Sequence, residues 1–232
     1  FLRDMGAVGI PVVCFDWMAG IRWARTATDV PVRGDALSTA YDDAQMRRGP
    51  VPEVARETSK EDLWENLEYF LEEVVPVAEE AGVYLGLHPD DPPRESVRGM
   101  PRIIDSVEAY ERVLDIVDSP HNGVTFCQGN FRLMTEDLPG AIRRFGDRIN
   151  FVHFRDVAGD RDGFTETFHD DGPTDMAACM AAYEEVGFDG PMRPDHVPTM
   201  AGEPNDRPGY MSLGRLFAVG YMTGLREQAG GD

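Results

Sequence analysis

The order of apolar and polar positions predicts strands and helices that alternate along the chain. Five short apolar runs have the length and composition of buried strands: Ile10–Phe15, Val83–Leu87, Gly123–Phe126, Ile149–Val152 and Pro191–Arg193. Between them, apolar residues recur at helical spacing, which predicts helices at about 60–81, 106–117, 137–145, 175–186 and 212–226. Alternation of this kind indicates βαβ units and a parallel sheet.

The fold class that we expect is α/β, a (β/α)8 TIM barrel with its active site at the carboxyl ends of the strands. A closed barrel of this type needs eight strands, and the apolar runs supply five. We therefore expect three further βα units, roughly 90 residues at about 30 each, ahead of Phe1. The chain starts without Met, in what resembles the end of a helix. Residues 1–232 are thus interpreted as one partial barrel domain.

Residues 30–57 interrupt this alternation. They are polar, contain Pro31, Pro50 and Pro52, and show no sustained periodicity. Connections of such length without secondary structure are usually lids or disordered segments. We expect a lid-like insertion at about 30–57, and a second loop, rich in Asp and Gly, at 156–173.

The composition narrows the class of protein. With 42% apolar and 28% charged residues the chain resembles a globular protein, and its net charge of -20 repels nucleic acid and anionic membranes. No run approaches the roughly 20 apolar residues that cross a bilayer, and no signal-peptide pattern opens the chain. The three cysteines are widely spaced, which argues against a disulfide framework and for a reduced cytoplasm.

The numbers of acidic residues, arginines and lysines bear on the salt concentration in which the protein works. Of the 22 basic residues, only Lys60 is a lysine, against 42 acidic residues. This excess of acid with almost no lysine suggests a halophilic protein from a salt-rich cytoplasm. The alternative is an ordinary acidic protein from a mesophile.

Four of the apolar runs lead into side chains that can bind a metal ion. These are His88, Cys127, His153 and Asp195. They lie too far apart along the chain for a zinc finger, but they fit four successive strand ends of a barrel. Each alone is more often a core or hydrogen-bonded residue, whereas the coincidence of all four favours one metal site. Two imidazoles, a thiolate and a carboxylate leave coordination positions open for substrate oxygens.

Two residues near the last run are candidate proton carriers. His196 directly follows Asp195, and an imidazole titrates near neutral pH, which suits a general acid or base. Tyr210 stands at the end of a Gly- and Pro-rich loop that could bring its hydroxyl to the same site. The alternative for Tyr210 is an aromatic anchor for the last helix.

Other residues are candidates for substrate binding. Arg25, Arg155 and Arg193 are the expected cations for a substrate carboxylate, since a guanidinium binds carboxylate through two parallel hydrogen bonds. Any of them could instead be salt-bridged in so acidic a chain. His169 lies in the loop after a site strand, either in contact with substrate or on the surface. Asp90, two residues after the metal candidate His88, completes the expected set of substrate-binding residues.

Taken together and in this order, the motifs resemble the mannonate dehydratase family of the xylose-isomerase-like barrel superfamily. They are His88-Pro89-Asp90-Asp91-Pro92-Pro93, Cys127-Gln128-Gly129, His153-Phe154-Arg155-Asp156-Val157, Phe168-His169-Asp170-Asp171-Gly172 with Asp175-Met176, Met192-Arg193-Pro194-Asp195-His196, and Trp23-Ala24-Arg25-Thr26. The resemblance covers nearly the whole chain.

The resemblance implies a function. It implies Mn²⁺, or Fe²⁺, bound by the four metal candidates, and dehydration of the sugar acid D-mannonate to 2-keto-3-deoxy-D-gluconate in hexuronate catabolism. It also implies that His196 and Tyr210 are the proton-transfer pair; which is acid and which is base stays open. We further expect a cytoplasmic homo-oligomer, a dimer.

Two alternatives remain. A sugar or sugar-acid isomerase on the same barrel usually binds its metal through carboxylates and histidine and often works with a lysine. Here Lys60 lies at a helix start, far from any strand end, which favours the dehydratase. The second alternative, motivated by the three missing units, is a truncated, non-catalytic, metal-binding remnant.

Overall fold

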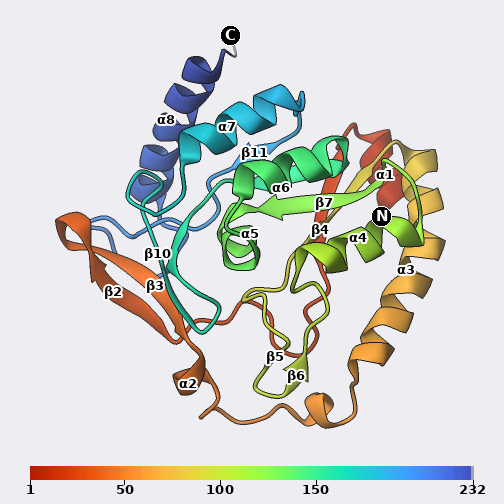
Figure 1. Cartoon of the computed structure of the whole chain (residues 1–232), viewed down its shortest axis with the longest axis horizontal. Coiled ribbons are helices and arrows are strands. Elements are labelled where there is room, and N and C mark those ends of the chain that lie inside the picture. Colours follow the sequence, from red (N-terminus) through yellow and green to blue (C-terminus); the bar gives the residue numbers. More distant parts are fainter. Residues whose placement is uncertain (231–232) are drawn as a thin grey trace.

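Five parallel strands form the central sheet of the protein, whose structure, a computed structural model, describes residues 1–230. The strands are β1 (Val12–Asp16), β4 (Tyr84–His88), β7 (Asn122–Cys127), β8 (Ile149–His153) and β11 (Met192–Arg193). Neighbours in the sheet follow the order β1-β4-β7-β8-β11, and every pairing is parallel. This half-barrel (Figure 1) contains the five strands predicted from the sequence. The three units ahead of Phe1 stay a prediction.

Helices connect the strands and cover the sheet. They are α1 (Leu2–Ala7), α2 (Asp43–Met46), α3 (Lys60–Ala81), α4 (Val107–Ile116), α5 (Gln128–Met134), α6 (Leu138–Phe145), α7 (Met176–Glu185) and α8 (Ser212–Ala229), with 3-10 turns η1 (Arg33–Asp35), η2 (Glu53–Arg56) and η3 (Gly146–Arg148). All five expected helices are present. The sequence did not reveal α5, a short helix with buried polar residues directly after β7. None of the helices in residues 1–230 has the length and apolar character needed to cross a membrane.

Helix α3 shows how local sequence sets an element. The Ser59 hydroxyl accepts from the Asp62 amide, and the Asp62 carboxylate accepts from the Ser59 amide, so a capping box satisfies the first turn. The helix continues through Pro76 and ends at Gly82, which has a φ of 65°. Glycine adopts this left-handed conformation without steric cost. The inner face of α3 packs on the sheet through leucines such as Leu67 and Leu71.

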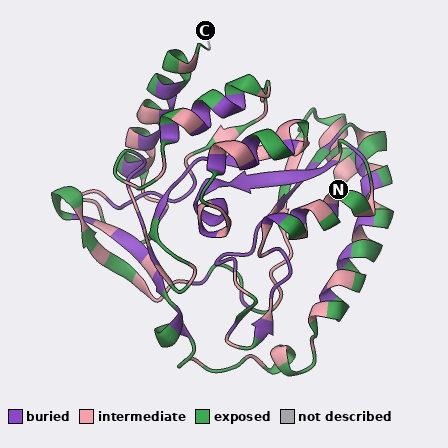
Figure 2. Ribbon diagram, viewed as in Figure 1, coloured by how far each residue is buried: buried purple, intermediate pink, exposed green. Residues whose placement is uncertain are grey.

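The core lies between the sheet and its helices. Strand β7 is buried along its whole length, whereas the outer face of α3 is exposed (Figure 2). The Phe126 ring of β7 stacks on Phe131 of α5 at 3.9 Å between centroids, and Phe145 of α6 packs edge-on against Phe131. A strand covered on both sides reads as a continuous apolar run, which explains why the sequence revealed β7.

A second, antiparallel sheet lies largely in two segments, 30–57 and 156–173, for which the sequence predicted only loops. Its strands are β2 (Ala27–Val32), β3 (Ala36–Asp42), β9 (Val157–Gly159) and β10 (Gly163–Glu166), in the order β2-β3-β10-β9. A small hairpin pairs β5 (Ser96–Val97) with β6 (Met100–Pro101). We found no periodicity in residues 30–57 and expected only loop at 156–173. The sequence pattern did not predict these strands, because several of their buried positions, such as Ser38, Thr39 and Glu166, are polar rather than apolar. A lid role for 30–57 stays a prediction.

The packing of α3 leads to a stability prediction. Leu71 is fully buried, so Leu71→Ala should lower the free energy of unfolding by about 2–5 kcal/mol through lost burial and the cavity left behind. Its exposed neighbour Glu72 is the control, and Glu72→Ala should change stability by no more than about 0.5 kcal/mol. Urea unfolding followed by circular dichroism measures both. Equal losses would mean that α3 does not pack on the sheet as described.

Candidate active site

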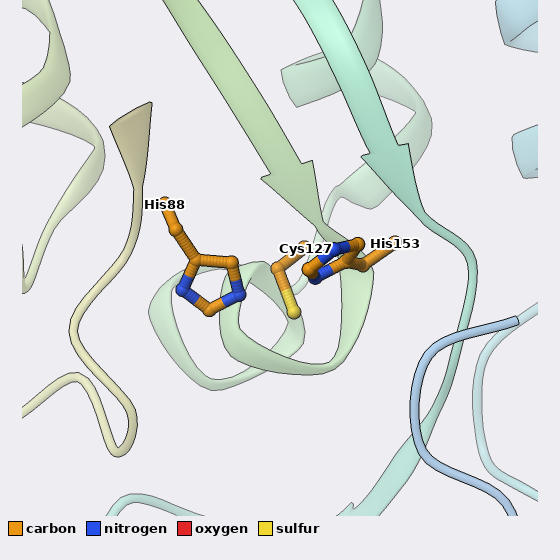
Figure 3. Close-up of side chains that lie close together, drawn as sticks. All are labelled: His88, Cys127 and His153. Atoms are coloured by element: carbon orange, nitrogen blue, oxygen red, sulfur yellow. The ribbon is translucent and has the colours of Figure 1, made fainter. Parts of the chain in front are cut away.

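Three metal-capable side chains meet at the carboxyl ends of neighbouring strands. His88 is the last residue of β4, Cys127 of β7 and His153 of β8, and Cys127 is paired in register with His153. One ligand atom from each lies within 4.8 Å of the others. Figure 3 shows the three side chains turned toward a common space. Because parallel strands end at one edge, residues far apart in sequence meet here.

The protonation of the two imidazoles suits metal binding. His88 Nδ1 lies 2.7 Å from the Pro89 carbonyl oxygen, which can only accept, so Nδ1 carries the proton and Nε2 keeps its lone pair. His153 Nδ1 is buried and has no hydrogen-bond partner within residues 1–230. Burial lowers the pKa of His88 and of His153, which leaves both rings neutral near neutral pH. Two neutral imidazoles and a thiol form a donor set that fits a divalent metal ion.

Asp195, the expected fourth ligand, lies beside this group. Its Oδ2 is 3.5 Å from His153 Nδ1, but the aspartate is outside the set of mutually close ligand atoms. Burial alone would raise the pKa of Asp195, yet attraction from the nearby cations Arg155 and Arg193 holds that pKa well below its usual value. The carboxylate is therefore ionised. Its role as a ligand stays a prediction.

The two expected proton carriers are in direct contact. His196 Nε2 lies 2.7 Å from the Tyr210 hydroxyl. The Trp23 ring packs against both, at 5.3 Å from the His196 ring and 6.4 Å from the Tyr210 ring. Burial, followed by the nearby charge of Asp195, raises the pKa of Tyr210 to about 12. The Tyr210 hydroxyl therefore keeps its proton near neutral pH.

A cavity of about 260 Å³ joins His88 and His153, two of the three metal-capable residues, to the proton carriers. Its lining comprises Cys14, Phe15, Asp16, Met18, Arg22, Trp23, His88, Asp91, His153, Arg193, Asp195, His196 and Tyr210. Among the arginines expected to bind substrate, Arg193 is in this lining and its side chain is 45% exposed. It forms an ion pair of 2.5 Å with Asp195. The cavity therefore carries a cation beside the metal-capable group.

Arg25 and Arg155 occupy a different position from the one expected. Both are buried in an ionic network behind the cavity, in the salt-bridged state that the sequence left open as an alternative. Arg25 binds Asp91 through two hydrogen bonds of 2.6 and 3.1 Å and also contacts Glu166. Arg155 lies 3.0 Å from Asp91, 2.9 Å from Glu166 and 3.0 Å from Asp195. Neither guanidinium lines the cavity.

Asp90 and His169 are also held by protein groups. The Asp90 carboxylate accepts hydrogen bonds from the backbone amides of Ile103 and Ile104. His169 Nε2 lies 3.1 Å from the carbonyl oxygen of Pro194, the residue that precedes Asp195 in the chain. Both side chains are buried, and neither is in the cavity lining. Their contacts brace the strand-end loops.

Two carboxylates of the network were missed as site residues. Asp91 directly follows the predicted candidate Asp90 in the motif that begins at His88, so its place in that motif was an available signal. Glu166 gave none, because it ends β10 in a segment without apolar periodicity. Its contact with His196, at 3.0 Å, depends on how the second sheet packs against the strand ends.

Comparison with known proteins identifies the family. A family model described as D-mannonate dehydratase (UxuA) matches residues 1–56 and 51–230. The chain belongs to the D-mannonate dehydratase family. A mannonate dehydratase of Enterococcus faecalis (strain ATCC 700802 / V583) is 38% identical over 97% of this chain and 72% of the relative. One from Streptococcus suis (strain 05ZYH33) is 35% identical over 97% of this chain and 69% of its own.

A solved structure agrees with this assignment to the D-mannonate dehydratase family. The crystal structure of mannonate dehydratase from Streptococcus suis serotype 2 superposes with a TM-score of 0.92 at 36% identity, covering 98% of this chain and 69% of that one. A structure of L-ribulose 3-epimerase matches with a TM-score of 0.58 at 16% identity, covering 98% of this chain and 66% of that one. This more distant likeness concerns the fold alone. The family resemblance and the barrel class inferred from the sequence are confirmed.

The ionic network leads to a second stability prediction. Arg155→Leu would leave three buried carboxylates without this cation, so the free energy of unfolding should fall by about 3–5 kcal/mol. Arg144 forms an exposed ion pair with Glu111, and Arg144→Leu should cost at most about 1 kcal/mol. Urea unfolding at neutral pH compares the variants. A cost for Arg155→Leu no larger than that for Arg144→Leu would contradict the network.

Proposed function

We propose that this protein dehydrates D-mannonate to 2-keto-3-deoxy-D-gluconate as a metal-dependent hydro-lyase of hexuronate catabolism. The observation that carries the proposal is the contact between the His196–Tyr210 pair and the cavity that also contains His88, His153 and Asp195. Membership of the D-mannonate dehydratase family supports the same reaction. One cavity thus combines a metal-capable group with a proton-transfer pair.

Four residues would hold the metal ion: His88, Cys127, His153 and Asp195. The neutral imidazoles, the ionised Asp195 and the His153 Nδ1 atom, which has no hydrogen-bond partner in the described part of the chain, support this set. When bound, a divalent cation would act as a Lewis acid, stabilising the negative charge that develops on the substrate as C2 loses its proton. We propose Mn²⁺, with Fe²⁺ as the alternative.

The protein's own residues then move the protons. His196 Nε2 is the general base that takes the proton from C2, which is α to the substrate carboxylate. The protonated Tyr210 hydroxyl gives its proton to the C3 hydroxyl, which leaves as water. The proton held on Nε2 can return to Tyr210 through their 2.7 Å contact. The enol product becomes the 2-keto acid, so atoms and protons balance.

Arg193 is the proposed partner of the substrate carboxylate. It lines the cavity together with Arg22, its side chain is 45% exposed, and a guanidinium can bind carboxylate through two parallel hydrogen bonds. We propose that four other candidates hold the site residues in place and do not contact the substrate, since each is bonded to protein groups: Arg25, Arg155, Asp90 and His169.

Lys60 argues against a sugar isomerase that depends on lysine. It begins α3 and lies 3.6 Å from Asp105, and it is not part of the cavity lining. No other lysine occurs in the chain. The net charge of -20 and the three widely spaced cysteines support our proposal of a salt-rich, reduced cytoplasm as the working environment. The homodimer stays a prediction.

A product assay tests the proposed reaction. The chain is incubated with D-mannonate and Mn²⁺ at high salt, and the 2-keto-3-deoxy acid is measured with thiobarbituric acid. The dehydratase proposal predicts this product. An isomerised sugar acid would favour the isomerase instead, and no reaction would favour a non-catalytic remnant.

The histidine of the proton-transfer pair is tested by substitution. His196→Asn should lower kcat by at least about 100-fold, because general acid–base catalysis contributes roughly 10²–10⁴-fold, and should leave the metal content unchanged. His121→Asn is the matched control. His121 precedes β7 at the opposite end of the sheet and contacts the Val83 carbonyl oxygen, so its loss should leave kcat unchanged. Full activity in His196→Asn would exclude the proposed base.

The thiol ligand is tested by metal analysis. Cys127→Ser should weaken Mn²⁺ binding by at least about 10-fold, since loss of even an outer partner of a metal ligand costs roughly 10–100-fold. Cys179→Ser is the control, because Cys179 is buried in α7 and, unlike Cys127, does not belong to the group of close ligand atoms found in residues 1–230. Titration followed by electron paramagnetic resonance gives both affinities. Undiminished binding in Cys127→Ser would remove the thiol from the ligand set.

A further inference from the structure

Glu166 is a buried carboxylate with no assigned role in the proposed reaction. It is the last residue of β10 and is 2% exposed. One of its oxygens, Oε1, lies 3.0 Å from His196 Nδ1, on the side of the ring opposite Tyr210. His196 is therefore held between a carboxylate and a phenol.

We propose that Glu166 is the positioning residue of the proton-transfer pair. It holds His196 in the tautomer with the proton on Nδ1, and so keeps Nε2 directed at Tyr210 and free to take a proton. This inference rests on the proposed function, because it gives Glu166 a task in that reaction.

The charge of Glu166 decides the direction of the hydrogen bond. Burial alone would raise the pKa of Glu166, but attraction from Arg155 and Arg25 holds that pKa well below its usual value. An ionised carboxylate can only accept, so His196 Nδ1 must donate. In the neutral ring, Nε2 is then the acceptor for the Tyr210 hydroxyl.

The two buried arginines fix the carboxylate itself. Arg25 contacts the oxygen that faces His196, and Arg155 binds the other oxygen at 2.9 Å. With both oxygens held, the carboxylate cannot rotate away from the imidazole. The opposite tautomer would place a proton on Nε2, and such a ring could not remove a proton from C2. Loss of Glu166 should therefore affect the chemical step more than substrate binding.

The tautomer can be observed directly by nitrogen NMR of protein labelled with ¹⁵N-histidine. The signals of His196 are assigned by their absence in His196→Asn. Wild type should show the proton on Nδ1, whereas Glu166→Gln should populate the form with the proton on Nε2. Asp91→Asn is the matched control. Asp91 belongs to the same network and binds both arginines but does not contact His196, so the tautomer should stay unchanged.

Kinetics provide the second measurement. Glu166→Gln should lower kcat by about 10²–10⁴-fold with little change in KM, the pattern of a loss felt only in the transition state, and Glu166→Asp should recover part of it. The inference is overturned if Glu166→Gln keeps the Nδ1–H tautomer, or if wild type has the proton on Nε2. A tautomer shift in a protein that forms no keto-deoxy acid would uphold the positioning by Glu166 and overturn the proposed reaction instead.

Discussion

The buried guanidinium of Arg155 is the group on which the arrangement of the site depends. It contacts Asp91 after β4, Glu166 at the end of β10 and Asp195 after β11. One cation therefore ties the small antiparallel sheet to two strand ends of the half-barrel. Buried carboxylates are costly without a partner. Arg155 compensates all three, Arg25 also compensates Asp91 and Glu166, and Arg193 also compensates Asp195. The geometry of the cavity follows from this charge balance.

The dipeptide Asp195-His196 separates two kinds of chemistry. Asp195 lies near the metal-capable group, at 3.5 Å from His153, whereas His196 contacts Glu166 and Tyr210. The chain achieves this with a φ of 53° at Asp195, in the left-handed region that costs energy for any residue but glycine. Both side chains line one cavity, with Asp195 Oδ2 3.8 Å from His196 Nδ1. The proposed dehydration assigns them different tasks, since charge is stabilised by one group and protons are moved by another.

The sequence was informative where the chemistry follows strong apolar runs. His88, Cys127 and His153 could be predicted to meet because each directly ends a buried parallel strand. The contact between Arg25 and Glu166 could not be predicted, because these two residues are 141 positions apart in the sequence. This contact depends on the pairing of β3 with β10. Some buried residues of those strands are polar, so the strands lack the alternation of apolar and polar residues that would predict them. Arginines that looked available for substrate were already occupied by carboxylates, one of which, Glu166, the sequence pattern did not reveal.

X-ray absorption at the manganese edge of the Mn²⁺-loaded protein tests most directly whether the three strand ends bind one ion. Scattering by one sulfur together with nitrogen and oxygen neighbours is the expected result, since Cys127 lies with His88 and His153 in one group of ligand atoms. A spectrum with nitrogen and oxygen neighbours alone, and no sulfur, would contradict it.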